Sequence, residues 1–143
     1  MESKLFPGTL DSLDPIRQYV KELSQQAGLD KKATYRLTLA VDEIATNIIL
    51  YGYEQAGRSG DIQVLSELSD AKLTVIFEDK AIPFDPTTKD LPDEEDFNKP
   101  LEERQIGGMG IWLTIKGVDE FKYEYVDDKN RNIFIMHVDP TKT

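Results

Sequence analysis

Two segments in the first third of the chain carry apolar residues at the spacing of an α-helix. The first, residues 11–28, opens with residues that can cap a helix and closes on Gly28, a residue typical of helix C-termini. The second begins near Asp30 and continues to about Tyr51. The apolar positions that repeat every three or four residues are Leu13, Ile16, Val20 and Leu23 in the first segment, and Leu37, Val41, Ile44 and Ile48 in the second. Both segments are therefore predicted to be amphipathic helices that bury one face.

Much of the remaining chain alternates between apolar and polar residues, the pattern of half-buried β-strands. A tight turn is predicted at Ser69–Asp70 and another about Asp127–Asn130, so the strands on either side of each turn should form hairpins. Ile62, Val64 and Leu68 are predicted to share the core-facing side of one strand. The predicted strands are residues 4–6, 61–69, 71–79, 121–128 and 131–138, with a short helix at residues 110–118. We expect an α+β fold: a two-layer sandwich with helices on one face of a mostly antiparallel, mixed sheet.

Length, charge and cysteine content limit the class of protein. With 143 residues the chain is long enough for one compact domain, residues 1–143, with a real core. The formal net charge of −10 disfavours nucleic acid or an anionic membrane as the main partner, because both would repel the chain. The sequence has no cysteine, no run of about 18 apolar residues, and no apolar signal core in residues 1–14. We therefore expect a soluble, cytoplasmic protein.

The second predicted helix carries an unusual polar pair, Glu43 and Asn47. Residues four apart lie one above the other on a helix, so this carboxylate and amide share one side, at the flank of the apolar stripe. A solvated helix edge would explain the pair by itself, since polar pairs at this spacing are common. The position could also border a cleft.

A long irregular segment separates the two predicted hairpins. Residues 79–106 are rich in proline and acidic residues, and such long loops in compact domains are usually functional lids or disordered inserts. Asp79 ends an apolar strand, where its carboxylate could accept a hydrogen bond from an amino group of a buried ligand. The glycine-rich stretch at residues 107–110 precedes a helix and would let backbone N–H groups approach phosphates, although an ordinary loop–helix junction has the same composition.

These motifs, in this order, resemble the ATP-binding (Bergerat-type) domain of the GHKL superfamily. The stretch Glu43–Asn47 (EIATN) matches the N box, Asp79–Pro86 (DKAIPFDP) resembles the D-x-G-x-P-F-D-P box, and Gly107–Ile111 (GGMGI) matches the second glycine box. The resemblance covers nearly the whole chain. It is closest to the stand-alone anti-sigma-factor serine kinases of bacterial partner-switching systems.

The resemblance implies roles for individual residues. Asn47 would help to hold Mg²⁺ against the phosphates of ATP, and Glu43 would be the general base that takes the proton of a substrate hydroxyl. Asp79 would pair with the adenine amino group, and residues 86–106 would form the ATP lid. Arg104 is a candidate phosphate contact, although a solvated lid arginine would look the same. The residues whose backbone would approach the phosphates are Gly107, Gly108 and Gly110.

One position departs from the family pattern. Ala81 stands where the first box usually has glycine, so a methyl group occupies space beside the adenine, and a positive φ there would be strained. We therefore expect nucleotide binding that is weakened rather than lost.

The resemblance implies a protein serine/threonine kinase that uses ATP and Mg²⁺. Such a kinase would inhibit a sigma factor by binding it and would phosphorylate a STAS-type anti-anti-sigma antagonist. A homodimer is a further assembly suggested by the family. Two alternatives stay open: a nucleotide-gated binding module that has lost phosphate transfer, and a partner-switch kinase whose output is not a sigma factor.

Overall fold

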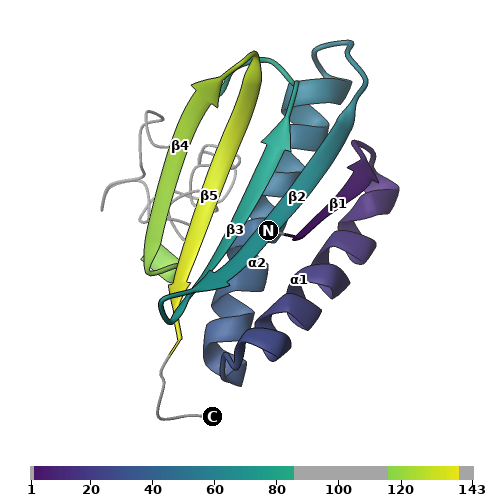
Figure 1. Ribbon diagram of the computed structural model, residues 1–143. Coiled ribbons are helices and arrows are strands. Elements are labelled where there is room, and N and C mark those ends of the chain that lie inside the picture. The colour runs from purple at the N-terminus through teal and green to yellow at the C-terminus, as the bar shows by residue number, and fades with distance from the viewer. Residues whose placement is uncertain (1, 86–115, 139–143) are drawn as a thin grey trace, which may run out of the picture.

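The computed structural model describes residues 2–85 and 116–138 (Figure 1). Its elements are β1 (Glu2–Pro7), a 3₁₀ turn (Leu10–Ser12), α1 (Leu13–Ala27), α2 (Lys31–Asn47), the π-helix η2 (Ile48–Glu54), β2 (Asp61–Ser69), β3 (Lys72–Asp79), β4 (Glu120–Val126) and β5 (Lys129–His137). Of the helix predicted at residues 110–118, Lys116 and Gly117 are helical and residues 110–115 lie outside the described ranges. Within the described ranges, no helix is long and apolar enough to cross a membrane.

The five strands form one sheet in the order β1-β2-β3-β5-β4, and each of these pairs is antiparallel. Both long helices pack on one face of this sheet, so the molecule has two layers (Figure 1). The predicted α+β sandwich is therefore confirmed. The mixed character that we expected is not seen among the described strands, which pair only in the antiparallel sense.

The helix ends follow the local sequence signals. Gly28 adopts a left-handed conformation with φ of 84°, which ends α1, and its N–H donates to the carbonyl groups of Ser24 and Gln25. The side chain of Asp30 accepts a hydrogen bond from the backbone N–H of Ala33 at 2.7 Å and caps α2. The helical residues that the core cluster buries include Ile16, Val20, Leu37, Val41 and Ile44.

Both hairpin turns differ from the prediction: the first lies one residue later than Ser69–Asp70, and the second is shorter than Asp127–Asn130. Asp70 and Ala71 form the first turn, and Asp127 and Asp128 form the second, with φ between 54° and 62° at all four residues. Two-residue turns of positive φ match the right-handed twist of the strands. Strand β5 therefore starts at Lys129, and Asn130, which we had placed in the turn, is a buried residue of the strand.

The prediction that Leu68 faces the core is wrong, because this side chain is 54% exposed. Ile62 and Val64, on the same side of β2, are fully buried. Leu68 lies close to the hairpin tip, past Ser66, where the pairing of β2 with the edge strand β1 ends.

The second helix continues past its predicted end with a change of geometry. We expected it to stop at about Tyr51, but α2 passes at Ile48 into π-helix η2, which ends at Glu54. Tyr53 fixes this segment: it is 2% exposed, and its hydroxyl donates to the carbonyl of Asp61 and accepts from the N–H of Lys80. The π-helix is thus anchored to the starts and ends of the neighbouring strands, and such turns are frequent at functional sites.

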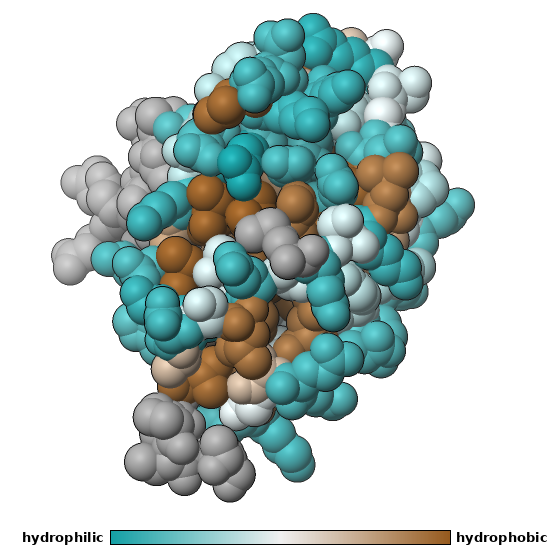
Figure 2. All heavy atoms as spheres, viewed as in Figure 1, coloured by the Kyte–Doolittle hydropathy of each residue, from teal (hydrophilic) through white to brown (hydrophobic). Residues whose placement is uncertain are grey.

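The sheet face opposite the helices is partly apolar. Figure 2 views the molecule from this side, and hydrophobic side chains gather over the middle of the sheet. Leu65, Ile76 and Ile133 lie next to one another across β2, β3 and β5. Ile76 and Ile135 are almost fully buried but do not belong to the core cluster between the helices and the sheet.

Candidate functional site

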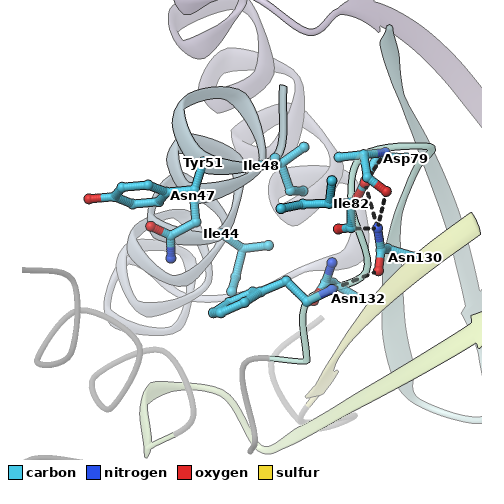
Figure 3. Close-up of a pocket in the computed structure, with 11 residues that line it drawn as sticks. Ile44, Asn47, Ile48, Tyr51, Asp79, Ile82, Asn130 and Asn132 are labelled. Atoms are coloured by element: carbon cyan, nitrogen blue, oxygen red, sulfur yellow. Dashed lines mark hydrogen bonds between the residues drawn. The ribbon is translucent and has the colours of Figure 1, made fainter. Parts of the chain in front are cut away.

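A cavity of about 320 Å³ lies between the end of α2 and the strands β3 and β5 (Figure 3). Its walls are largely hydrophobic, and a few polar side chains enter it, which is the usual composition of a small-molecule site. The apolar lining residues are Ile44, Ile48, Ala81, Ile82 and Phe84, the polar side chains are Asn47, Tyr51, Asp79, Asn130 and Asn132, and Gly52 completes the lining.

Asp79 is the buried acid of this cavity. It is the last residue of β3 and is only 3% exposed. Its Oδ1 accepts hydrogen bonds from the N–H of Ala81 at 3.0 Å and from Nδ2 of Asn130 at 2.9 Å, whereas Oδ2 has no partner among the described residues. Burial raises the pKa of Asp79 from 3.8 to about 6, and the two hydrogen bonds oppose that rise. One carboxylate oxygen is thus left for a donor that the described residues do not supply.

Asn130 holds the chain segment that follows Asp79. Its Nδ2 also lies 3.1 Å from the carbonyl oxygen of Ala81 and 3.2 Å from that of Ile82. Its Oδ1 accepts from the N–H of Phe84 at 3.3 Å and from the hydroxyl of Tyr123. A single amide on β5 therefore fixes both the carboxylate of Asp79 and the wall formed by residues 81–84 (Figure 3).

Of the polar pair on α2, Asn47 lines the cavity and Glu43 does not. Asn47, the last residue of α2, lines it on the side opposite Asp79 and Asn130 (Figure 3). Glu43 lies one helical turn earlier, is partly buried, and does not line the cavity itself. A ligand in the cavity would therefore contact Asn47 first, with Glu43 next to it along the helix.

A family model for the histidine kinase-like ATPase domain matches residues 6–137 of this sequence. The match covers both helices and all the strands after β1. The chain belongs to the histidine kinase-like ATPase domain family. The resemblance read from the three boxes is confirmed, and the cavity lies between the helix that carries the N box and the strand that ends in Asp79.

Three known proteins are similar to this chain in sequence or in structure. The serine-protein kinase RsbW from Staphylococcus aureus strain MSSA476 is 26% identical over 115 residues, which is 80% of this chain and 72% of the relative. The RsbW of strain MRSA252 is 25% identical over the same coverage. A crystal structure of the RsbU and RsbW domains of Rv1364c from Mycobacterium tuberculosis superposes with a TM-score of 0.63 at 14% identity. That match covers 96% of this chain but 32% of the larger protein, and it bears on the fold alone.

The structure brings together some of the predicted site residues. Asn47, Asp79 and Ala81 line one cavity, although they come from α2, from the end of β3 and from the loop after it. Glu43 lies on the same helix, one turn from Asn47. The remaining predicted elements lie outside the described residues and stay predictions: Arg104, Gly107, Gly108, Gly110 and the lid at residues 86–106.

Sequence reasoning missed Asn130, Asn132 and Gly52. The signal for the two asparagines was available, because Phe134 and Met136 are core-facing and residues two and four positions earlier share their side of the strand. Polar residues at core-facing positions of a strand need a partner or a ligand. The predicted turn at Asp127–Asn130 places Asn130 outside the strand, so the alternation is not followed back to it.

Ala81, which replaces the glycine usual in the family, packs against Gly52. Ala81 is 4% exposed, and its φ is not among the positive values of the non-glycine residues described, so its backbone carries no strain of that kind. A Cβ placed on Gly52 would lie 2.6 Å from the Cβ of Ala81. The methyl group of Ala81 is therefore accommodated because residue 52 in the π-helix has no side chain.

Replacing Gly52 by alanine should lower both the stability of the protein and its affinity for ADP. Adding Ala81→Gly to this variant should restore both. Two methyl carbons cannot lie 2.6 Å apart, and such overpacking typically lowers the free energy of unfolding by about 1–3 kcal/mol. Urea unfolding and calorimetric titration with ADP would measure both effects. A Gly52→Ala variant as stable and as tight-binding as the parent protein would show that the two residues do not restrict each other.

Proposed function

We propose that this protein is an ATP-dependent protein serine/threonine kinase that regulates a bacterial partner switch. The observation that carries the proposal is the unpartnered Oδ2 of Asp79 at the back of an apolar cavity bordered by the N-box helix. A flat base with an amino group fits such a site, since its ring would contact the apolar walls and its N–H would satisfy the carboxylate. Membership of the ATPase family supports ATP as the nucleotide.

In the proposed phosphate transfer, Asn47 and Glu43 of α2 have different roles. Asn47 offers an amide oxygen at the side of the cavity opposite Asp79, and this oxygen would be a suitable ligand for Mg²⁺. The metal would supply neutralisation of phosphate charge. Glu43 accepts the proton of the attacking hydroxyl as that oxygen bonds to the γ-phosphorus and the bond from this phosphorus to the β–γ bridging oxygen breaks. The products are ADP and a phosphorylated serine or threonine.

The partners in this proposal follow from the relatives. RsbW proteins are named as serine-protein kinases, which supports a protein substrate with a hydroxyl side chain. We propose a STAS-type antagonist as that substrate and a sigma factor, or another regulator, as the second partner. We further propose a cytoplasmic location and leave open a homodimer as the functional form.

Incubation with radiolabelled ATP, Mg²⁺ and proteins captured from a native extract would test the proposal. We expect one captured protein to receive a phosphate on serine or threonine, and we expect ATP and ADP to change which partner is retained. Wild-type protein that binds ATP and its partners without transferring phosphate would refute the kinase. The nucleotide-gated binding module would then be the better explanation, with Ala81, which lines the cavity, as the first residue to test.

A further inference from the structure

A groove of about 380 Å³ lies between α1 and α2, and no described residue lines both this groove and the cavity. The two helices lie side by side on the sheet and run antiparallel, because only residues 28–30 connect them (Figure 1). Leu29 of this connection lines one end of the groove. At the other end, Nε of Arg17 donates to Oδ1 of Asp42 at 2.7 Å. From Lys31 to Asp42 the groove follows α2 for about 16 Å, roughly three helical turns.

Two large apolar side chains of α2 are exposed at this groove. Tyr35 is 67% exposed and Leu39 is 42% exposed, and both line the groove. Residues four apart lie one above the other on a helix, so the two side chains form one apolar ridge. The helix packs on the sheet through its other side, where Leu37 and Val41 are fully buried. Packing within this chain therefore does not account for the exposed ridge, and an apolar patch of this kind marks an interaction site.

The groove is basic, although the chain has a net charge of −10. Lys21 and Lys31 line it and are exposed, and neither belongs to an ion pair within residues 2–85 and 116–138. Arg17 is paired with Asp14 and Asp42, so the two lysines carry the uncompensated charge. Two such grooves brought face to face would repel each other, which disfavours a second copy of this chain as the occupant. The charge favours an acidic partner instead.

We propose that the groove between α1 and α2 binds an acidic amphipathic helix of a partner protein. A third helix packs its ridge of side chains into the groove between two others. Its apolar stripe covers Tyr35 and Leu39, and carboxylates beside this stripe pair with Lys21 and Lys31. The inference goes beyond the proposed function and does not depend on phosphate transfer, because the groove is separate from the cavity.

Selection from a phage-displayed library of random peptides of about 16 residues, long enough for the three turns of the groove, tests the proposal. The full chain is the bait, and phage that bind a Tyr35→Ser, Leu39→Ser double variant are removed first. We expect the enriched peptides to be negatively charged and to carry apolar residues three or four positions apart. Fluorescence anisotropy then measures the affinity of a synthetic enriched peptide. Lys21→Glu and Lys31→Glu should each weaken it at least about 5-fold, and so should a rise in salt from about 0.1 M to 1 M.

Two residues of β4 provide matched controls. Tyr125 and Lys122 are exposed and do not line the groove, so Tyr125→Ser and Lys122→Glu should leave the peptide affinity unchanged. All the replaced side chains are exposed, and circular dichroism would check that the variants fold. Should the double variant not fold, Tyr35→Ser alone replaces it in the selection.

Three results would overturn the inference. The first is a selection that enriches no peptide, and the second is a set of enriched peptides that lack negative charge or bind the lysine variants as tightly as wild type. The third is a wild-type dimer, seen by sedimentation, that the Tyr35→Ser, Leu39→Ser variant dissociates, because a second copy of the chain would then occupy the groove.

Discussion

Replacing Glu43 by alanine should strongly slow phosphate transfer while leaving nucleotide affinity almost unchanged. The loss should be about 10²-fold to 10⁴-fold, the contribution of a positioned general base. Affinity should be retained because Glu43 does not line the cavity, whereas Asn47, one turn further along α2, does. Glu43→Gln should lose transfer to a similar extent, since an amide of the same size cannot accept the proton.

Asn47→Ala gives the contrasting result. It should weaken Mg²⁺-dependent ATP binding and transfer together, because this side chain would act through the metal on the bound nucleotide. Single-turnover transfer from radiolabelled ATP, measured beside calorimetric ATP affinity, separates the two variants. If Glu43→Ala transferred phosphate at the wild-type rate, Glu43 would not be the base, whatever its effect on affinity.

Replacing Asp79 by asparagine should weaken nucleotide binding and at the same time stabilise the free protein. Asparagine can keep the oxygen that accepts from Ala81 and Asn130, but it places an NH₂ group where the unpartnered Oδ2 now lies. That group would face the amino group of the base, donor against donor. Affinity for ADP should fall by roughly 10-fold to 100-fold, the range for a hydrogen bond to a charged group.

The gain in stability depends on pH with a definite sign. Burial raises the pKa of Asp79 from 3.8 to about 6, so between these values the folded protein binds more protons than the unfolded chain. The contribution of this group to the free energy of unfolding therefore decreases as the pH rises and levels off above pH 6. Relative to wild type, Asp79→Asn should gain about 1.5 kcal/mol at pH 5 and about 3 kcal/mol at pH 7.5.

Urea unfolding at these two pH values would measure the gain. Asp61→Asn is a matched control, because Asp61 is an exposed carboxylate at the start of β2 and does not line the cavity. A gain for Asp79→Asn that is equal at both pH values would contradict a raised pKa. A variant less stable than wild type at pH 7.5 would show that the carboxylate has a structural role in the free protein.

Local signals in the sequence were enough for the elements and for part of the site. The spacing of Ile16, Val20, Leu37 and Val41 predicted both helices, and alternation predicted the strands, because burial of one face depends only on a residue's position in its own element. The motif order pointed to the ATPase family, which the family match confirms. The roles of Glu43, Asn47 and Asp79 stay predictions for the experiments above.

By itself, therefore, the sequence determined the two-layer α+β class, the family, and the helix and strand end that border the site. Tertiary structure decided the order of the strands, which pairs β3 with β5 and so brings Asn130 beside Asp79 across 51 residues of sequence. It also decided that Gly52 meets Ala81, and that Asn132 is left with an unpartnered oxygen. These relations depend on which strands become neighbours and on where the π-helix lies against them, and the pattern within one element does not specify its contacts with elements far away in the chain.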